Sequence, residues 1–292
     1  MGFESCHPAV NFIFFAAALY GTVRFNHPVF LAIAYVSAFA YSVKRCGKRA
    51  VAFNLCLLPL ILVFALYYSS YHHFGVTVLR QNFIGNNLTV ESFVYGLVIG
   101  LRFAALCMWL EAIFRIVTSD KVVYLFGRIS PQLSLFLTIL LRFIPRVGRE
   151  ARKINLAQKG IGRGSNQGNV FQRFINCLRI FSMLITWMIS ALVQESDSMR
   201  SRGSLLRGRT AFSIYRFDNR DRAFVITLFT CITLTVMGVI LGASKMWYNP
   251  RIIWRPLNGI GMTAAVGYLA LCLLPLGLEL WTEYRFRRAR GK

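Results

Sequence analysis

Six long apolar runs along the chain predict helices that span a membrane. A helix needs about 20 mostly apolar residues to cross the roughly 30 Å of hydrocarbon in a bilayer. The runs that meet or approach this length are His7–Val23, Pro28–Val43, Val51–Tyr71, Val90–Val117, Ala223–Ala243 and Leu257–Trp281. Since the first run has neither a basic segment before it nor a clear small-residue cleavage site, we expect a span and not a signal peptide. The pattern predicts an all-α, polytopic bundle of membrane helices.

The chain between the fourth and fifth runs has a different pattern. Val122–Ile144 and Ile175–Val193 are apolar enough to enter the bilayer, and they either cross it, which would give eight crossings, or lie in its interface as amphipathic helices. Pro145–Lys159 repeats its apolar residues every three or four positions, and glycines follow it. Trp187–Arg202 mixes apolar and charged residues and ends before Gly203, a residue suited to helix termination. We expect two similar amphipathic helices, each with a basic last turn and a glycine after it.

The composition agrees with a membrane protein. Of the 292 residues, 56% are hydrophobic and 15% charged, with a mean hydropathy of +0.52. These values exclude a disordered chain, a collagen and a coiled-coil rod. The 34 Lys and Arg residues against 11 Asp and Glu give a net charge of +23, which in a soluble protein would suggest nucleic-acid binding. In a membrane protein the cytoplasmic loops collect Lys and Arg, and we favour this interpretation.

Clusters of basic residues fix the expected orientation. Lys44, Arg45, Lys48 and Arg49 lie between the second and third runs, and residues 121–222 contain 18 of the Lys and Arg residues. A third cluster follows the last run and consists of Arg285, Arg287, Arg288, Arg290 and Lys292. Six crossings of the cell membrane with both termini in the cytoplasm satisfy all three clusters. The exceptions, all in the last outer loop, are Lys245, Arg251 and Arg255.

This topology divides the chain into three parts. Residues 1–120 hold about four N-terminal membrane helices, residues 121–222 form a cytoplasmic or interfacial region, and residues 223–292 form a C-terminal membrane hairpin with a basic tail. The middle region carries most of the features that distinguish this chain from a plain helical bundle.

The sequence offers no catalytic, cofactor-binding or metal-binding motif. No phosphate loop is present, the acidic residues are dispersed, and the seven cysteines are scattered without a CxxC pair. His72 and His73 lack a nearby carboxylate, so we expect a solvated loop there and not a metal site. Glu111 and Arg115 are spaced for an ion pair on one helix face. Arg102 lies near the middle of the fourth run, where it either faces a bundle interior or a water-filled cavity, or snorkels or packs against a neighbouring helix.

Five short segments carry a resemblance to a known family. In chain order they are Asn26-His27-Pro28, Leu141-Arg142-Phe143-Ile144-Pro145, Ala157-Gln158-Lys159, Asp197-Ser198-Met199-Arg200-Ser201-Arg202-Gly203 and Gly208-Arg209-Thr210. Together, over essentially the whole chain, they resemble the transmembrane T component of energy-coupling factor (ECF) transporters. The resemblance implies a non-catalytic coupling subunit of an ABC-type importer. Such a subunit links two cytoplasmic ABC ATPases to a small substrate-binding membrane protein, the S component, for uptake of a vitamin or metal ion such as cobalt.

The family carries two Ala-Arg-Gly-type motifs, each at the end of a coupling helix. Ser201-Arg202-Gly203 matches the second motif with Ser in place of Ala. The first motif departs, because the family pattern places Ala, Arg and Gly at Gly160, Ile161 and Gly162, where only Gly162 fits. The basic residues that could substitute for the missing Arg are Lys159 and Arg163. The resemblance implies ATPase contacts at Ser201, Arg202, Gly203, Lys159, Gly162 and Arg163.

Two other functions fit parts of the sequence. A membrane-embedded enzyme or anchor could use the basic face to attract anionic lipid, but an enzyme would need a His or carboxylate cluster that the sequence lacks. A nucleic-acid-binding anchor would need aromatic residues among the basic loops. Phe171, Phe174, Phe212, Tyr215 and Phe217 are available there, although helix packing explains them more simply. We therefore expect the two ATPases, an S component and the bilayer as partners, and no nucleic acid.

Overall fold

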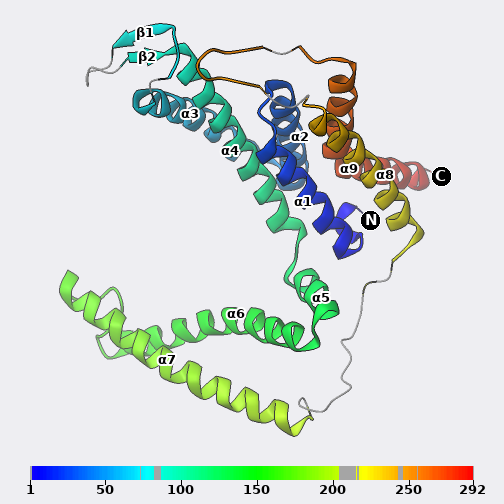
Figure 1. The fold of residues 1–292 in the computed structure, drawn as a ribbon. Helices are drawn as coiled ribbons and strands as arrows, with labels where there is room; N and C mark the ends of the chain where they lie inside the picture. Colours follow the sequence, from blue (N-terminus) through cyan, green and yellow to red (C-terminus); the bar gives the residue numbers. More distant parts are fainter. Residues whose placement is uncertain are drawn as a thin grey trace. The chain divides into compact units, whose positions relative to one another are not determined.

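The protein forms two compact units in its computed structural model (Figure 1). The structure describes residues 2–72, 74–81, 87–203, 215, 217–242, 246–254 and 256–291. Unit 1 combines Met1–Thr118 with Tyr215–Lys292, and unit 2 is Ser119–Ile214. The Gly208-Arg209-Thr210 segment, Lys245 and Arg255, which the sequence analysis used, lie outside the described residues, as does Ala243 at the expected end of one span.

Unit 1 consists almost entirely of helices. Its elements are η1 (Phe3–Ser5), α1 (Pro8–Arg24), α2 (Pro28–Cys46), α3 (Lys48–Tyr71), α4 (Val90–Ile116), α8 (Asn219–Ile240), α9 (Gly259–Arg290) and the antiparallel strands β1 (Val78–Gln81) and β2 (Asn87–Thr89). His7 and His27 cap α1 and α2, because each ring Nδ1 accepts a backbone N–H two residues on. Pro8 and Pro28 follow at the first helical position, where proline loses no helix hydrogen bond. The all-α fold class is confirmed, and the small hairpin in the third loop was not predicted.

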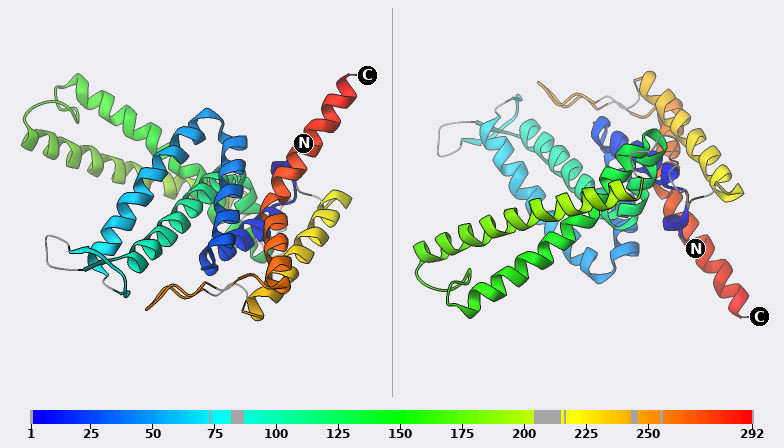
Figure 2. Two further views of the ribbon diagram at one scale, coloured as in Figure 1. Left: turned by 90° about the horizontal axis from the view of Figure 1, so that it is seen from above. Right: turned by 90° about the horizontal axis from the view of Figure 1, so that it is seen from below.

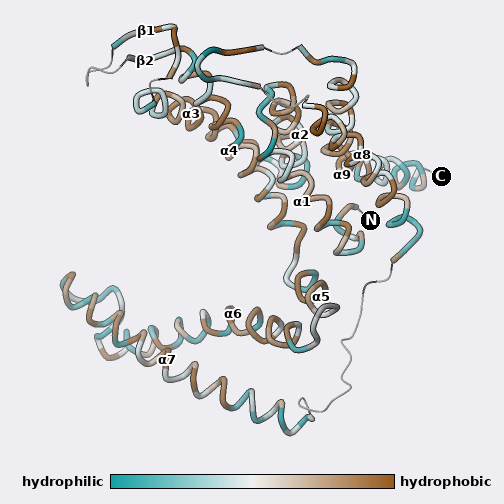
Figure 3. Tube along the Cα trace, viewed as in Figure 1, coloured by the Kyte–Doolittle hydropathy of each residue, from teal (hydrophilic) through white to brown (hydrophobic). Residues whose placement is uncertain are grey.

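Six helices of the described chain are long and apolar enough to cross a membrane: α2, α3, α4, α7, α8 and α9. Five of them coincide with predicted runs, and the protein is a multi-pass membrane protein. The sixth, α7, covers Ile175–Val193, for which the sequence left open whether the helix crosses the bilayer or lies in its interface. The first predicted run became α1, whose 17 residues span about 26 Å and are too few to join this group. Apolar colouring covers most of α3 and α4 in Figure 3, and polar colouring marks the end of α9.

The core of unit 1 is built around α4 and α9. Helix α4 packs against α1, α2 and α3, while α9 packs against α2 and α8. Trp109 of α4 is fully buried, with ring centroids 5.8 Å from Phe14 and 6.1 Å from Tyr41. Helices α3 and α4 come very close at Gly96, where a Cβ atom would lie 3.0 Å from the backbone of Ala65. Aromatic side chains and small residues thus set the spacing of the bundle.

One end of unit 1, which we call the charged end, joins the N-terminus to α2 and α9 through ion pairs. Arg45 pairs with Glu4 and lies 3.8 Å from Glu279, and Lys44 lies 2.8 Å from Glu283. The start of α8 reaches the same N-terminal segment. These contacts place the two ends of the chain and the α2–α3 turn on one side of the bundle, in agreement with the parity that the basic clusters predict.

The opposite end, which we call the aromatic end, joins the α1–α2 turn to the loop before α9. Arg102 donates to the carbonyl oxygen of Phe25 at 3.1 Å and to Asn26 Oδ1. The Tyr248 hydroxyl donates to the Asn26 carbonyl oxygen at 2.8 Å, and its ring lies 5.4 Å from that of Tyr95. Of the two interpretations left open for Arg102, the structure supports the packed helix neighbour. The side chain also satisfies a carbonyl at the end of α1.

Unit 2 contains α5 (Ser119–Ile129), α6 (Pro131–Gly160) and α7 (Val170–Ser201). The sequence suggested one apolar run up to Ile144 and a separate helix from Pro145. Instead, the chain breaks at Ser130, because the residue before a proline disfavours helical backbone and Pro131 starts the next helix. Helix α6 then continues through Pro145, which removes one internal hydrogen bond without ending the helix.

Helices α6 and α7 pack against each other along part of their lengths (Figure 2). The loop between them is held by side chains: Asn176 Nδ2 donates to the Gly164 carbonyl oxygen at 3.3 Å, and Asn155 Oδ1 accepts from Ser165 N–H at 3.1 Å. Asn169 and Gln172 form a capping box at the start of α7. The loop is therefore a defined turn that follows the end of α6 and precedes the start of α7.

Candidate functional site

The end of α6 is a hydrogen-bonded helix stop. Gly162 has a φ of +75°, and its N–H donates to the Lys159 carbonyl oxygen at 3.1 Å. The N–H of Arg163 donates to the Gln158 carbonyl oxygen at 2.9 Å. This pair of bonds is the Schellman motif, which satisfies carbonyl groups that the helix leaves unpaired. Glycine is required at this position, because a left-handed backbone is unfavourable for other residues.

The end of α7 also stops at a left-handed glycine. Gly203 has a φ of +72°, and its N–H donates to the Arg200 carbonyl oxygen at 3.0 Å. Ser201 is the last helical residue, and its hydroxyl donates to the Ser198 carbonyl oxygen at 2.9 Å. Ser201 and Arg202 are exposed. The sequence prediction of two helices that each stop at a glycine is confirmed in this respect.

Aligned on the left-handed glycine, the two helix ends differ in one position. Arg202 directly precedes Gly203, whereas Ile161 holds the equivalent position before Gly162. Ile161 is 64% exposed, so an apolar side chain stands where the other helix presents a guanidinium group. Arg163 follows its glycine, whereas Arg202 precedes its own. The first motif therefore departs from the family pattern by presenting an apolar side chain where the second motif presents a guanidinium group.

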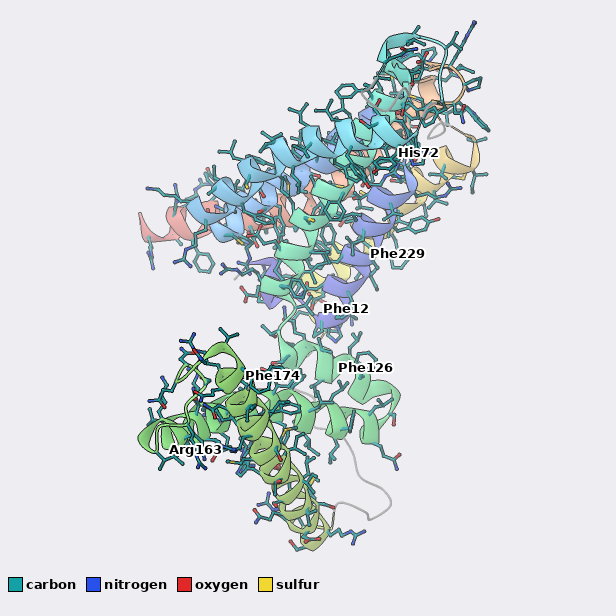
Figure 4. The ribbon with its side chains drawn as sticks, turned by 90° about the vertical axis from the view of Figure 1, so that its left-hand side faces the viewer. Phe12, His72, Phe126, Arg163, Phe174 and Phe229 are labelled. Carbon is teal, nitrogen blue, oxygen red and sulfur yellow. The ribbon has the colours of Figure 1, made fainter. Side chains whose placement is uncertain are left out.

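The cationic side chains at both ends are free to meet a partner. Within the described parts of the chain, neither Arg163 nor Arg202 forms an ion pair. Lys159 is also exposed and lies in the last turn of α6, where the helix dipole favours positive charge. Figure 4 labels Arg163 in the turn between α6 and α7 and Phe174 near the start of α7. The predicted contact residues are therefore accessible, and their binding role stays a prediction.

A broad apolar surface runs along α7. The exposed large apolar side chains of α7 include Val170, Phe171, Phe174, Leu178, Phe181, Ile185, Ile189, Leu192 and Val193. Only 11% of the most apolar window of α7 is buried inside the structure. Apolar surface of this extent is unusual in water, so lipid or another protein has to cover it. The sequence predicts apolar runs here, and the structure adds that most of their side chains are uncovered within the described chain.

Other predicted features have simple structural roles. Glu111 accepts a hydrogen bond from the Ser42 hydroxyl at 2.7 Å, and among the described residues no ion pair joins it to Arg115. The predicted Glu111–Arg115 pair is therefore wrong, because Glu111 turns towards α2. His72 is exposed, and its ring packs against Tyr68 in a tilted arrangement with centroids 4.3 Å apart, while His73 lies outside the described residues. The described residues contain no group of three or more His, Cys, Asp or Glu that could hold a metal.

The fold defines a multi-pass helical membrane protein with a second helical unit inserted between α4 and α8. No protein-family model matches the chain. Over 169 residues it is 28% identical to the energy-coupling factor transporter transmembrane protein EcfT 1 of Listeria monocytogenes serotype 1/2a (strain 08-5578). The match covers 53% of this chain and 62% of that relative, so the chain spans about three fifths of the relative's length. The resemblance to the T components of ECF transporters is confirmed.

Proposed function

We propose that this chain is the transmembrane coupling subunit of an ECF-type importer. In this function it links two cytoplasmic ABC ATPases to an S component, and ATP hydrolysis by the ATPases drives uptake of a vitamin or metal ion. The observation that carries the proposal is the matched construction of α6 and α7, which each end at an exposed cationic stretch and a left-handed glycine. The similarity to EcfT 1 supports the same assignment.

The geometry suits the transmission of movement. A helix end seated in a groove of a partner moves as a rigid body, since packed side chains have discrete arrangements and do not deform continuously. Arg202 can donate two parallel hydrogen bonds to a carboxylate of the ATPase, a geometry that lysine cannot reproduce. The end of α6 would bind its ATPase differently, with Ile161 in an apolar contact and Lys159 or Arg163 beside it.

The same proposal orients the protein in the membrane. The charged end of unit 1 carries the N-terminus, the α2–α3 turn and the basic tail of α9, so we propose that it faces the cytoplasm. The chain leaves unit 1 after Thr118 and returns at Tyr215. If the charged end faces the cytoplasm, the aromatic end lies on the outer side of the membrane. We propose that the ends of α6 and α7 are then available to soluble ATPases.

Co-purification with the partner ATPases tests the function. We expect Arg202→Ala to reduce recovery of the ATPases and substrate uptake strongly, because an unpaired partner carboxylate in a buried contact costs about 2–5 kcal/mol. Arg202→Lys should be intermediate, and Arg163→Ala should have a smaller effect. Arg179→Ala is the matched control, since Arg179 is exposed in the middle of α7 and forms no ion pair among the described residues.

Two results would contradict the proposal. Wild-type recovery and uptake for Arg202→Ala would remove the assigned contact, and equal losses for Arg179→Ala would show a general effect of charge. The purified chain alone should hydrolyse no ATP, because its sequence contains no phosphate loop. ATPase activity that survives removal of every partner would exclude a purely coupling role.

A further inference from the structure

A basic groove lies between α6 and α7, on the N-terminal side of the glycine that ends each helix. Its first cavity, of about 230 Å³, is lined by Ile139, Arg142, Phe143, Arg146, Arg149 and Glu195. A second cavity of about 360 Å³ shares Arg146 and Arg149 and adds Glu150, Lys153 and Trp187. Successive basic residues three or four positions apart lie on one face of a helix, so α6 presents a continuous cationic stripe to α7. We call this feature the α6–α7 basic groove.

The acidic residues in the groove do not balance its basic residues. Arg146 Nη1 lies 3.3 Å from Glu195 Oε2, and Lys153 Nζ lies 3.1 Å from Glu150 Oε2. Both acidic side chains are thereby engaged. Arg142 and Arg149 form no ion pair within the described parts of the chain. Two guanidinium groups flank a third in one groove, and their mutual repulsion is relieved when an anion binds between them.

The groove is held in a defined shape. The ring of Trp187 stacks on Phe143, with centroids 6.2 Å apart and planes inclined by 13°. The guanidinium group of Arg146 lies 5.6 Å from the Trp187 centroid, in addition to its pair with Glu195. Since a cation–π contact and an ion pair both fix Arg146, the central cationic group is preorganised. An incoming anion therefore finds this donor already in place.

We propose that the α6–α7 basic groove binds the phosphate group of an anionic phospholipid. Arginine donates paired hydrogen bonds that match phosphate oxygens. A lipid fits better than a free phosphate, because the apolar side chains of Ile139 and Phe143 line the same groove as the arginines. Acyl chains would follow these apolar side chains, and Trp187 would then lie at the boundary of headgroups and hydrocarbon, where tryptophan is favoured.

The lipid site goes beyond the coupling function and does not depend on it. Arg149 and Gly162 are 13 residues apart along the chain, or about 20 Å if the helical rise is extended over that distance. A lipid in the groove would hold α6 and α7 at the membrane surface whichever protein binds their ends. The site would remain if the assigned ATPase contact at Arg202 proved wrong.

Photocrosslinking of lipids to the full-length chain tests the proposal. The protein is placed in phosphatidylcholine nanodiscs with a small fraction of diazirine-labelled phosphatidylglycerol or, in parallel, diazirine-labelled phosphatidylcholine, and the crosslinks are mapped by mass spectrometry. We expect residues 136–153 and 187–195 to capture the phosphatidylglycerol probe preferentially. Arg142→Gln with Arg149→Gln should reduce that preference roughly tenfold or more, because each basic residue adds to the attraction for anionic lipid.

Matched variants separate lipid binding from folding and from general charge. Arg287→Gln with Arg288→Gln removes two exposed basic residues from the end of α9 and should leave the groove crosslinks unchanged. Arg142→Lys with Arg149→Lys keeps the charge and should retain part of the preference. Three results would overturn the proposal: equal capture of both probes, full capture by the double Gln variant, or loss of capture when inorganic phosphate alone is added. The last result would assign the groove to a free anion.

Discussion

Unit 1 and unit 2 use apolar helices in different ways. In α9 of unit 1, 44% of the most apolar window is buried within the structure, whereas the corresponding value for α7 of unit 2 is 11%. Unit 1 therefore supplies its own core, with Trp109 and neighbouring aromatic rings at its centre. Unit 2 leaves its apolar side chains to be covered by lipid or by partners. The contrast teaches that helices of similar hydropathy can belong to a stable frame or to a binding surface.

The largest expected effect is a loss of stability in unit 1. Trp109→Ala removes a fully buried ring and should lower the free energy of unfolding by about 3–5 kcal/mol. Phe181→Ala in α7 removes a ring that is 58% exposed and should change it by less than about 0.5 kcal/mol. Thermal unfolding in detergent measures both. Similar losses of stability for the two variants would contradict the distinction between unit 1 as a stable frame and α7 as a binding surface.

A second variant tests the aromatic end of unit 1. Arg102→Leu removes the donor to the Phe25 carbonyl oxygen and to Asn26, and should cost about 1–3 kcal/mol because a buried acceptor loses its partner. Arg24→Leu is the control, since Arg24 is exposed at the end of α1. If both variants unfold at the wild-type temperature, Arg102 does not stabilise the α1–α2 turn. The alternative interpretation, that Arg102 faces a water-filled cavity, would then be favoured.

Smaller effects are expected from the glycines that end α6 and α7. Gly162→Ala and Gly203→Ala each force a side chain into left-handed backbone, which costs about 1–2 kcal/mol locally. Hydrogen exchange should accelerate in the last turns of α6 or α7 and remain unchanged in unit 1. Gly148→Ala is a control within α6, because that glycine is helical and has open space around it. Faster hydrogen exchange throughout unit 1 in either variant would show that the two units do not unfold independently.

A titration gives the finest test of the aromatic end. Burial raises the pKa of Tyr248 from its usual value near 10 to about 12. Because the folded protein holds this proton more tightly than the unfolded chain, the resulting stabilisation is complete below pH 10 and is lost as the pH rises through about 12. The phenolate absorbance difference between wild type and Tyr248→Phe should develop near that pH. If the pKa of Tyr248 were instead near its usual value of 10, the hydroxyl would be exposed to water and the aromatic end would not be packed.

The sequence predicts those features of the fold that depend on a local pattern of residues. Run length predicted five of the membrane helices, and the spacing to Gly162 and Gly203 predicted both helix stops. It misplaced the α5–α6 boundary, because the apolar run continues through Ser130 while the backbone restriction imposed by Pro131 ends the helix there. It also missed the α6–α7 basic groove. The stripe from Arg142 to Lys153 was readable, but its pairing with Trp187 and Glu195 depends on how two helices pack.

The central claim is that unit 2 presents its helix ends to the cytoplasm while unit 1 spans the membrane. Single cysteines are introduced into a cysteine-free chain at Asn166, in the α6–α7 turn, and at Val76, in the exposed loop of the aromatic end. Intact cells are then treated with a membrane-impermeant thiol reagent. We predict labelling at position 76, and labelling at position 166 only after the cells are opened. Strong labelling at position 166 in intact cells would contradict the account.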